Sequence, residues 1–591
     1  MGLRVPRSAL RIAALATIVA AGGASLACRQ RGGATATLGE RTRLTFTGHA
    51  AYPAISGDGK RLAYAEPHCR GGQCAYSIKV QDVGATTSRD IGVEATTIWT
   101  IRWSPDNRNL LFTGVAQQGW ASYLVPAVGG APARVAPECA ILTQDGRSIV
   151  WTNDLGPGTD HWLQITGLDG KAKGKLLVRG AAEYFVILTA VPNSPWIIVR
   201  LGTHAFNDEL RAIDLSGKQG GSFAIHGLGA GAVSASADAI WTQLEAADST
   251  KVDIVRVPFD PESGRFGAKS EILYTGDSGG SPALFSVTAD GRTLAVNEAK
   301  TEFGAWAANL EDVLQGTLPA DKQLLHSITK PVGLRISPDG QRLLMMRPGS
   351  SASGGTSHWT IAPFPGGPET PLRDSGGAID DARWNDSSTL RLKEQMPHGT
   401  RFSLLDLASG QRRASLDLPA GEAVVDYVSL PDGSWAWTSG MGTAMHLQRG
   451  DQASPRSLPI PGFVQTIALD ATKDGKQIAI FGSPEPAADS PLGVSVMSLP
   501  EGRITSWWSG TSYDDPARAS WLPGGSMLMF LWNGPGTVPL YRLDAPGHVK
   551  KLGTVPRSLS ELTVSRDLQR AAIVTNDFSG DTWLRKVSLR K

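Results

Sequence analysis

Short apolar segments alternate with tight polar turns along nearly the whole chain, and this alternation is its dominant pattern. Segments such as 147–153, 292–298 and 477–482 are rich in residues typical of strands, and Gly, Asp, Asn and Pro lie at their ends. After the N-terminal region, residues 307–315 form the one stretch with helical spacing. The pattern predicts an all-β protein built from short strands joined by hairpins.

One phrase recurs between these strands: an apolar residue, a Ser-Pro-Asp-Gly-type turn, then an apolar strand. Asp58 and Asp106 lie 48 residues apart, and Asp290 and Asp339 lie 49 apart. Pro fixes φ, Asp bonds its own backbone and Gly supplies positive φ, so the phrase is typical of a hairpin turn. This period is typical of a four-stranded propeller blade, and 591 residues hold about twelve of them. Clear copies contain Asp58, Asp106, Asp145, Asp290, Asp339, Asp432 and Asp474, and weaker ones lie near Asn193, Asp238, Asp386, Gly524 and Asp567.

Twelve blades are many for one ring, so the chain is expected to form tandem β-propellers. We expect two rings of about six blades, residues 41–320 and 321–591, with 5 + 7 as the alternative. The polar segment 310–323 is the expected joint. The last unit lacks a fourth strand, whereas residues 43–47 form a surplus strand before the first. The two ends are therefore expected to pair and leave no open sheet edge, with residues 43–47 closing the second ring, and this pairing would nest the second ring inside the first.

The N-terminal segment is typical of an export signal rather than of the fold. Residues 1–27 combine three early arginines with an apolar run over 12–27, and Cys28 follows directly. This resembles a bacterial lipoprotein signal, which implies a lipidated Cys28, although Ser25 stands where that pattern prefers Leu. An ordinary secretory signal or an uncleaved anchor is the alternative. Residues 28–40 are expected to be a flexible tether, and Arg29, in the place of a retention Asp, favours the outer membrane.

Charge and cysteine content narrow the function classes. The chain has 57 Lys and Arg against 55 Asp and Glu, which implies no basic face and argues against nucleic-acid binding. Export implies an oxidising compartment, so Cys69 and Cys74 are expected to form a disulfide. The alternative, a metal site that includes His68, is one ligand short of a closed zinc site. Cys139 is expected to be a buried, inert thiol.

The turn phrase resembles the WD40-like (PD40) repeat of the TolB family. The resemblance rests on Ser104-Pro105-Asp106, Ser337-Pro338-Asp339-Gly340 and Leu430-Pro431-Asp432-Gly433, with looser copies at Ser56-Gly57-Asp58-Gly59 and Thr288-Ala289-Asp290-Gly291. It covers roughly residues 41–591. It implies a β-propeller, and the family includes periplasmic envelope proteins that bind other proteins. Similar propellers also lie beside peptidase or kinase domains, but this chain has no kinase motif set and no room for another catalytic domain.

Acidic residues gather just before the inner strands of the second half, on the approach to a channel mouth. Converging carboxylates there could hold a cation such as Ca²⁺ or a basic peptide segment. The alternative is a solvated rim in which each Asp stabilises its own turn. The candidate binding residues are Asp380, Asp381, Asp426, Asp514, Asp515 and Glu561.

Other motifs are expected to be structural. Residues 276–280, GDSGG, resemble a protease nucleophile loop around Ser278, but no upstream segment resembles the His loop, so an inter-blade turn is favoured. Residues 152–163 and 575–584 lack the spacing of an EF-hand and are expected to be hairpin loops. Tryptophans near inner-strand ends are expected to pack between blades, and those on loops are candidates for sugar stacking. The first group is Trp103, Trp384 and Trp521, and the second is Trp99, Trp120 and Trp508.

These observations favour an exported, lipid-anchored, non-catalytic propeller that binds an envelope protein or peptide. Two alternatives remain open: an enzyme that acts on glycans, as a lyase or hydrolase at the channel mouth, and a sensory propeller for a small ligand. No catalytic residue, metal ligand or cofactor is assigned, and Ca²⁺ stays an open alternative. Fold alone licenses none of these functions.

Overall fold

The structure is a computed structural model, and it describes residues 35–590 with short gaps. The gaps are 71–72, 153–160, 169–173, 181–183, 203–206, 227–232, 246–250, 278–283, 316–322, 328–331, 348–357, 373–377, 420–421, 423, 440–443, 451, 453, 462–464, 484–492, 511–514, 533–537 and 556–558. The signal segment, Cys28 and Ser278 lie outside the described residues. None of the helices in the described part is long and apolar enough to span a bilayer.

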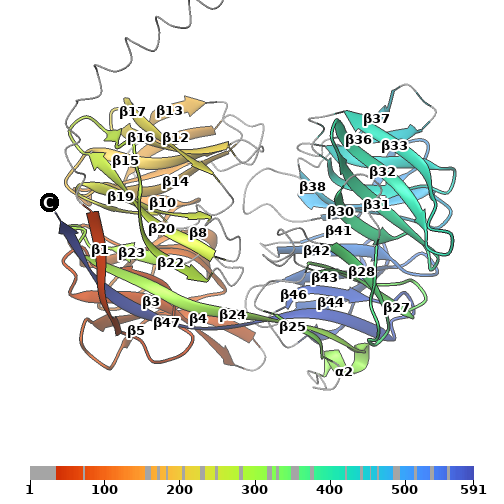
Figure 1. Cartoon of the computed structure of the whole chain (residues 1–591), viewed down its shortest axis with the longest axis horizontal. Helices are drawn as coiled ribbons and strands as arrows, with labels where there is room; N and C mark the ends of the chain where they lie inside the picture. The colour runs from red at the N-terminus through yellow and green to blue at the C-terminus, as the bar shows by residue number, and fades with distance from the viewer. Residues whose placement is uncertain are drawn as a thin grey trace, which may run out of the picture.

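The fold is all-β, a pair of β-propellers that lie side by side (Figure 1). Five four-stranded blades of ring one follow one another along the chain, each antiparallel and in simple strand order; the fifth carries an extra strand, β21. Their strands are β2 (Ala51–Ile55), β3 (Arg61–Arg70), β4 (Gln73–Asp82), β5 (Arg89–Ala95); β6 (Thr97–Trp103), β7 (Asn109–Ala116), β8 (Gly119–Pro126), β9 (Ala133–Ala136); β10 (Ala140–Leu142), β11 (Ser148–Thr152), β12 (His161–Gly167), β13 (Lys175–Gly180); β14 (Tyr184–Ala190), β15 (Trp196–Gly202), β16 (Asn207–Asp214), β17 (Gln219–His226); and β18 (Val233–Ser236), β19 (Ala239–Glu245), β20 (Lys251–Asp260), β21 (Arg265–Phe266), β22 (Glu271–Asp277).

Ring two repeats the arrangement with five further four-stranded blades. Their strands are β26 (Val332–Ile336), β27 (Arg342–Arg347), β28 (His358–Pro363), β29 (Thr370–Pro371); β30 (Ala378–Trp384), β31 (Thr389–Met396), β32 (Gly399–Asp406), β33 (Arg412–Pro419); β34 (Val424–Ser429), β35 (Ser434–Ser439), β36 (Ala444–Arg449), β37 (Arg456–Pro459); β38 (Gln465–Ala471), β39 (Gln477–Ser483), β40 (Gly493–Ser498), β41 (Arg503–Ser509); and β42 (Asp515–Trp521), β43 (Met527–Trp532), β44 (Val538–Ala545), β45 (His548–Val555).

The sixth blade of each ring comes from one shared sheet. Its two central strands, β24 (Thr293–Asn309) and β47 (Arg570–Arg590), pair along their length and run from one ring into the other (Figure 1). At the ring-one end they are flanked by β23 (Phe285–Val287) and β1 (Thr35–Arg43), and at the ring-two end by β25 (Gln323–Ser327) and β46 (Leu559–Val564). Counted this way, the expected arrangement of two six-bladed rings holds.

The chain ends do pair, but not through the expected strand. Ring one, not ring two, is closed by the N-terminal strand, and that strand is β1, residues 35–43, instead of 43–47. Residues 35–40 therefore belong to the fold and not to a tether. The side chain of Asp581 explains this placement: it accepts hydrogen bonds from the Thr45 hydroxyl at 2.8 Å and the Gly48 amide at 3.2 Å, which hold 44–48 as a loop against β47.

The expected joint and one expected loop are also corrected. The chain passes between rings within β24, before residue 310, and the short helix α2 (Leu310–Leu314) packs on the shared blade of ring two. Residues 575–584 lie inside β47 and not in a hairpin loop. Their Asn, Asp and Gly residues are typical of turns, yet each backbone pairs with β24, and this long-range pairing overrides local preference. Residues 153–160 of the matching segment lie outside the described residues.

The core lies between blades, because a four-stranded sheet cannot bury its own faces. Ile78 and Val93 of one ring-one blade, for example, share a buried cluster with Phe112 and Tyr123 of the next. Comparable clusters lie between the other blades. This packing makes each blade depend on its neighbours.

The recurring turn is held by one hydrogen-bond set. The Ser104 hydroxyl donates to Asp106 and accepts from the Asn109 amide at 2.9 Å, while the Asp106 carboxylate accepts from the Arg108 amide at 3.0 Å. The same set recurs at Ser56, Thr143, Thr288, Ser337, Thr472 and Ser565. The turn is thus defined by a hydroxyl residue followed two positions later by Asp. Because this hydrogen-bond set involves neither the Pro nor the Gly position, some copies lack one or both of these residues.

Candidate binding sites in the central channels

The innermost strands line a channel in each ring, and tryptophans at their ends join neighbouring blades. The indole N–H of Trp103 donates to the Ala54 carbonyl of the preceding blade at 2.7 Å. Trp384 donates to the Arg335 carbonyl at 3.1 Å, and Trp521 to the Asp470 carbonyl at 3.2 Å. The predicted packing role of these tryptophans is confirmed.

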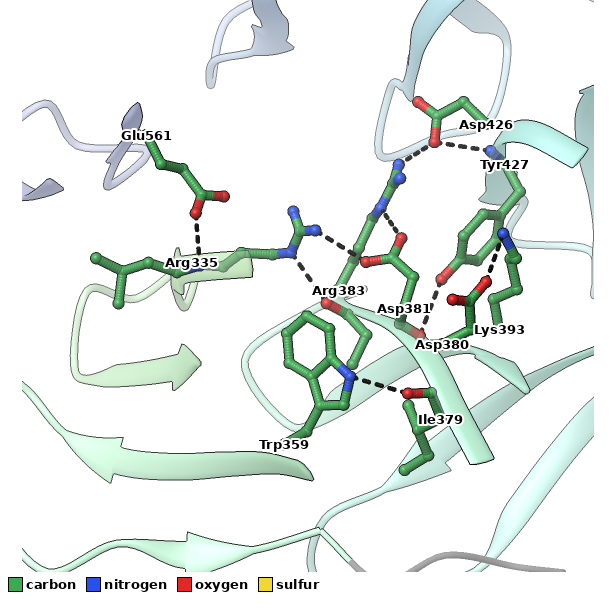
Figure 2. Close-up of polar contacts among 12 residues, drawn as sticks. Arg335, Trp359, Ile379, Asp380, Asp381, Arg383, Lys393, Asp426, Tyr427 and Glu561 are labelled. Atoms are coloured by element: carbon green, nitrogen blue, oxygen red, sulfur yellow. Dashed lines mark hydrogen bonds and ion pairs between the residues drawn. The ribbon is translucent and has the colours of Figure 1, made fainter. Parts of the chain in front are cut away.

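The ring-two channel carries alternating arginines and aspartates, which Figure 2 shows. Asp381 receives Arg335 of the preceding blade at 2.9 Å and Arg383 of its own strand at 2.6 Å. Arg383 also contacts Asp426 of the following blade. Asp426, only 2 % exposed, accepts backbone N–H bonds from Tyr427 at 3.0 Å and Leu469 at 2.7 Å.

We call the chain of ion pairs Arg335–Asp381–Arg383–Asp426 the ladder. The pKa shifts of its members agree with charges that neutralise one another. Burial alone would lower the pKa of Arg383, but Asp426 and then Asp381 raise it above its ordinary value. The guanidinium also lies 4.9 Å from the ring centre of Tyr427, whose own pKa burial raises. Beside it, burial lowers the pKa of Arg391, and Asp470 opposes that shift. These aspartates are occupied by the chain's own cations.

Within the described residues, the predicted acidic positions are therefore paired with groups of the chain itself. Asp380 points to Lys393 at 2.7 Å, with the Asp side chain 51 % exposed. Glu561 accepts the Leu334 amide at 3.1 Å and so links the last and first inner strands of ring two (Figure 2). The described part of the chain contains no group of three or more potential metal ligands. Asp514 lies outside the described residues, and for Asp515 only the backbone, in β42, is described.

Ring one differs, because its channel contains a cavity of about 360 Å³. All six inner strands contribute to its wall, through residues such as Trp99, Ile141, Ala190, Val233 and Phe285. Trp99 is 58 % exposed and lies edge-to-face with Trp120 at 6.3 Å. The cavity wall is thus mixed, with slightly more polar than apolar exposed surface, and it offers an aromatic ring to a ligand.

Tyr52 adds a strained wall position to this cavity. It sits in a bulge of β2 with φ +53°, in the left-handed region that costs a non-glycine residue free energy. Its ring packs edge-to-face on Tyr76 at 6.2 Å, and burial raises its pKa well above the ordinary value. A strained residue at a cavity wall is a common mark of a binding site.

The remaining sequence candidates are placed as follows. All three tryptophans predicted on loops lie on strands: Trp99 on β6, Trp120 on β8 and Trp508 on β41. Trp508 is half-buried against a core cluster. Cys69 and Cys74 are opposite each other in the β3–β4 register, while their side chains lie outside the described residues, so the disulfide stays a prediction. Cys139 is half-buried instead of buried, and it accepts the Thr113 hydroxyl at 3.9 Å.

Sequence reasoning directed attention to the ring-two channel and missed the cavity in ring one. Acidic residues drew attention to the second half, where the structure pairs the described ones with Arg, Lys or backbone groups. The available signal was the dipeptide Arg-Trp, which occurs at Arg102-Trp103 with no acidic residue before it and at Arg383-Trp384 after two aspartates. The two matching positions thus differ in whether acidic residues precede the arginine.

Comparisons with known proteins support the fold only. No protein-family profile matches the chain, and no curated protein does. The crystal structure of the tricorn protease is similar over 88 % of this chain at 10 % identity and a TM-score of 0.28. This chain covers 59 % of the tricorn chain. The crystal structure of TolB from Acinetobacter baumannii matches 58 % of this chain and 81 % of its own, at 13 % identity and a TM-score of 0.30. The chain thus resembles solved β-propeller proteins, at a level that carries no function with it.

Proposed function

We propose that the protein is an exported, lipid-anchored binding scaffold, and not an enzyme, that takes a segment of an envelope protein or peptide into the ring-one channel. The observation that carries this is the cavity of about 360 Å³, which all six inner strands build and whose mixed polar and apolar wall includes the exposed side chain of Trp99. A cavity of this size suits a few residues of an extended peptide. In ring two, by contrast, arginines of the inner strands already pair with Asp381 and Asp426, and we assign these pairs a structural role.

Binding by the ring-one channel can be tested with peptide selection on the folded protein. A random peptide library displayed on phage is selected against the full mature chain. Trp99→Ala should weaken the selected peptides about tenfold or more, because aromatic anchors dominate such interfaces. Ile272→Ala is the matched control, since Ile272 is 63 % exposed on β22, away from the cavity. If the selected peptides bind Trp99→Ala and Ile272→Ala with the affinity they have for wild type, they bind outside the ring-one cavity.

A small-ligand sensor is the second candidate, since the same cavity volume also suits a compact organic molecule. Calorimetry with panels of glycans and small metabolites separates this function from peptide binding. Turnover of a glycan by the purified protein would favour the enzyme alternative instead.

The anchor and location rest on the sequence alone. Lipidation of Cys28 predicts that the mature protein begins there and that it fractionates with the outer membrane. Cys28→Ser should move the protein to the soluble periplasmic fraction, and intact mass spectrometry should show loss of the acyl mass. An unchanged mass and membrane association would contradict a lipid anchor. The expected location is the periplasmic side of the outer membrane.

A further inference from the structure

Three arginines occupy matching places on the inner strands, where each faces the following blade. Arg335 and Arg383 contact Asp381 and Asp426 of the next inner strand. Arg102 holds the equivalent place on β6 in ring one. By analogy with ring two, the ion-pair partner of Arg102 is expected at the equivalent position on the inner strand of the following blade.

Two observations establish that Arg102 and Arg383 are equivalent. Both strands carry a register shift just upstream, between Ile98 and Thr100 in β6 and between Ile379 and Asp381 in β30. Each arginine is followed by a tryptophan whose indole binds a carbonyl of the preceding blade. Thr100 therefore stands where ring two has Asp381.

The position equivalent to Asp426 also lacks a carboxylate in ring one, because Cys139 occupies it. Asp426 lies six residues before the turn aspartate Asp432, and Cys139 lies six residues before Asp145 in the blade that follows Arg102. Cys139 lies close enough to Arg102 that an ionised thiol there would raise the pKa of the guanidinium. Ring one thus keeps the arginine and has neither of the aspartates that neutralise it in ring two.

Arg102 is left with its charge uncompensated. With the described residues it makes no hydrogen bond or ion pair, and its buried Nε has no acceptor. Burial lowers the pKa of its guanidinium, yet arginine stays protonated in proteins. It lines the cavity of about 360 Å³, and among the described lining residues it alone is charged. Arg102 is half-buried, and a cation that is partly removed from water without a partner among the described residues favours an anion.

We propose that the ring-one channel binds a carboxylate through Arg102, with the apolar remainder of the ligand against Trp99 and its neighbours. This rests on the proposed function in taking the cavity as the binding site, and it adds the chemistry of the anchor. The carboxylate fits because the same arginine place binds two aspartates in ring two, in the geometry that a guanidinium offers to carboxylates. Its source is an Asp or Glu side chain of a peptide, or a small carboxylic acid.

The test compares acids with their neutral counterparts on the full mature chain at constant ionic strength. One arm uses 3-phenylpropanoate against 3-phenylpropanamide. The other uses capped pentapeptide pools with a central Asp against pools with a central Asn. Calorimetry and quenching of tryptophan fluorescence report binding, because Trp99 and Trp103 line the cavity. We expect binding of the acid in at least one arm and binding weaker by about tenfold or more for the amide or Asn counterpart.

Variants assign the effect to Arg102. Arg102→Met should remove acid binding, whereas Arg134→Met, an exposed arginine on β9 outside the cavity, should not. Thr100→Asp should also remove acid binding while raising the melting temperature, because it supplies an internal carboxylate as in ring two. A higher melting temperature of Thr100→Asp would show that the variant is folded, so that its loss of acid binding could not be attributed to misfolding.

Each outcome is decisive. Binding of the Asp pool alone assigns a peptide side chain, and binding of phenylpropanoate alone assigns a small acid. If neither acid binds, or if Arg102→Met binds acids like wild type, the carboxylate anchor is wrong. If Asp and Asn pools bind alike and Arg102→Met changes neither, the anchor is wrong while peptide binding in the channel stands.

Discussion

At the scale of residues, a hydroxyl and a carboxylate two positions apart define the repeat. Hydrogen bonds from Ser56 to Asp58, Ser104 to Asp106 and Thr143 to Asp145 lower the pKa of each aspartate. The carboxylates are largely solvent-exposed, so each contributes little by itself. The effect on the molecule comes from repetition around both rings.

This lowering predicts how stability depends on pH. A group with a depressed native pKa stabilises the fold fully above its unfolded value, about 4, and loses that contribution as pH falls through the native value. The urea midpoint should therefore be level from about pH 7 to 5 and fall below about pH 4. The triple variant Asp58→Asn, Asp106→Asn and Asp145→Asn should show a shallower fall. An acid limb as steep as that of wild type would contradict the assignment.

Loss of a buried carboxylate should lower the free energy of unfolding more than loss of an exposed one. Asp426→Asn keeps an acceptor for the Leu469 amide but removes the charge that faces Arg383, and removal of one partner of a buried pair costs ~3 kcal/mol. Asp380→Asn breaks an exposed pair with Lys393 and should cost less than ~1 kcal/mol. Urea unfolding of both variants measures the difference. Equal losses would show that the ladder is not buried in solution.

At the scale of elements, the local sequence pattern predicted the blades but missed the strands that form only by pairing with distant parts of the chain. The turn phrase, the strands and the tryptophans at inner-strand ends are local, and the structure has them where expected. The strand β1 and the crossing of β24 and β47 depend on partners more than two hundred residues away, and no local preference reports them. For the same reason the acidic positions near Asp381 could be named, but their arginine partners on neighbouring blades could not.

Closure of ring one by β1 can be tested by shortening the chain. A protein that begins at Leu44 lacks the strand that pairs with β47 from Trp583 to Arg590. It should melt at lower temperature and aggregate more readily, because β47 becomes an open edge. A protein that begins at Thr35 should melt like the full mature chain. Equal melting of the two proteins would show that β1 contributes no stability.

At the scale of the whole molecule, the two rings are not consecutive domains. Ring one needs both the start and the end of the chain, whereas ring two lies within them, joined through β24 and β47 (Figure 1). The nested arrangement follows from the pairing of the ends. Unfolding should accordingly be more cooperative than for rings joined by a single linker.

Dissection of the chain tests this topology. Residues 35–320 alone should not fold, since they lack β47, the strand between β24 and β1. The same segment cut at residue 300 and joined by a Gly/Ser linker to residues 579–590 should recover a folded ring one by circular dichroism and cooperative melting. A folded 35–320 segment without that strand would contradict the described topology.

The last 21 residues resolved as a strand, β47, belong to both rings at once. Neither ring can complete its sixth blade before residues 570–590 have been synthesised, because β47 supplies a strand to both. Closure of the two rings is therefore tied to one segment, and blade edges of both rings stay open until that segment pairs.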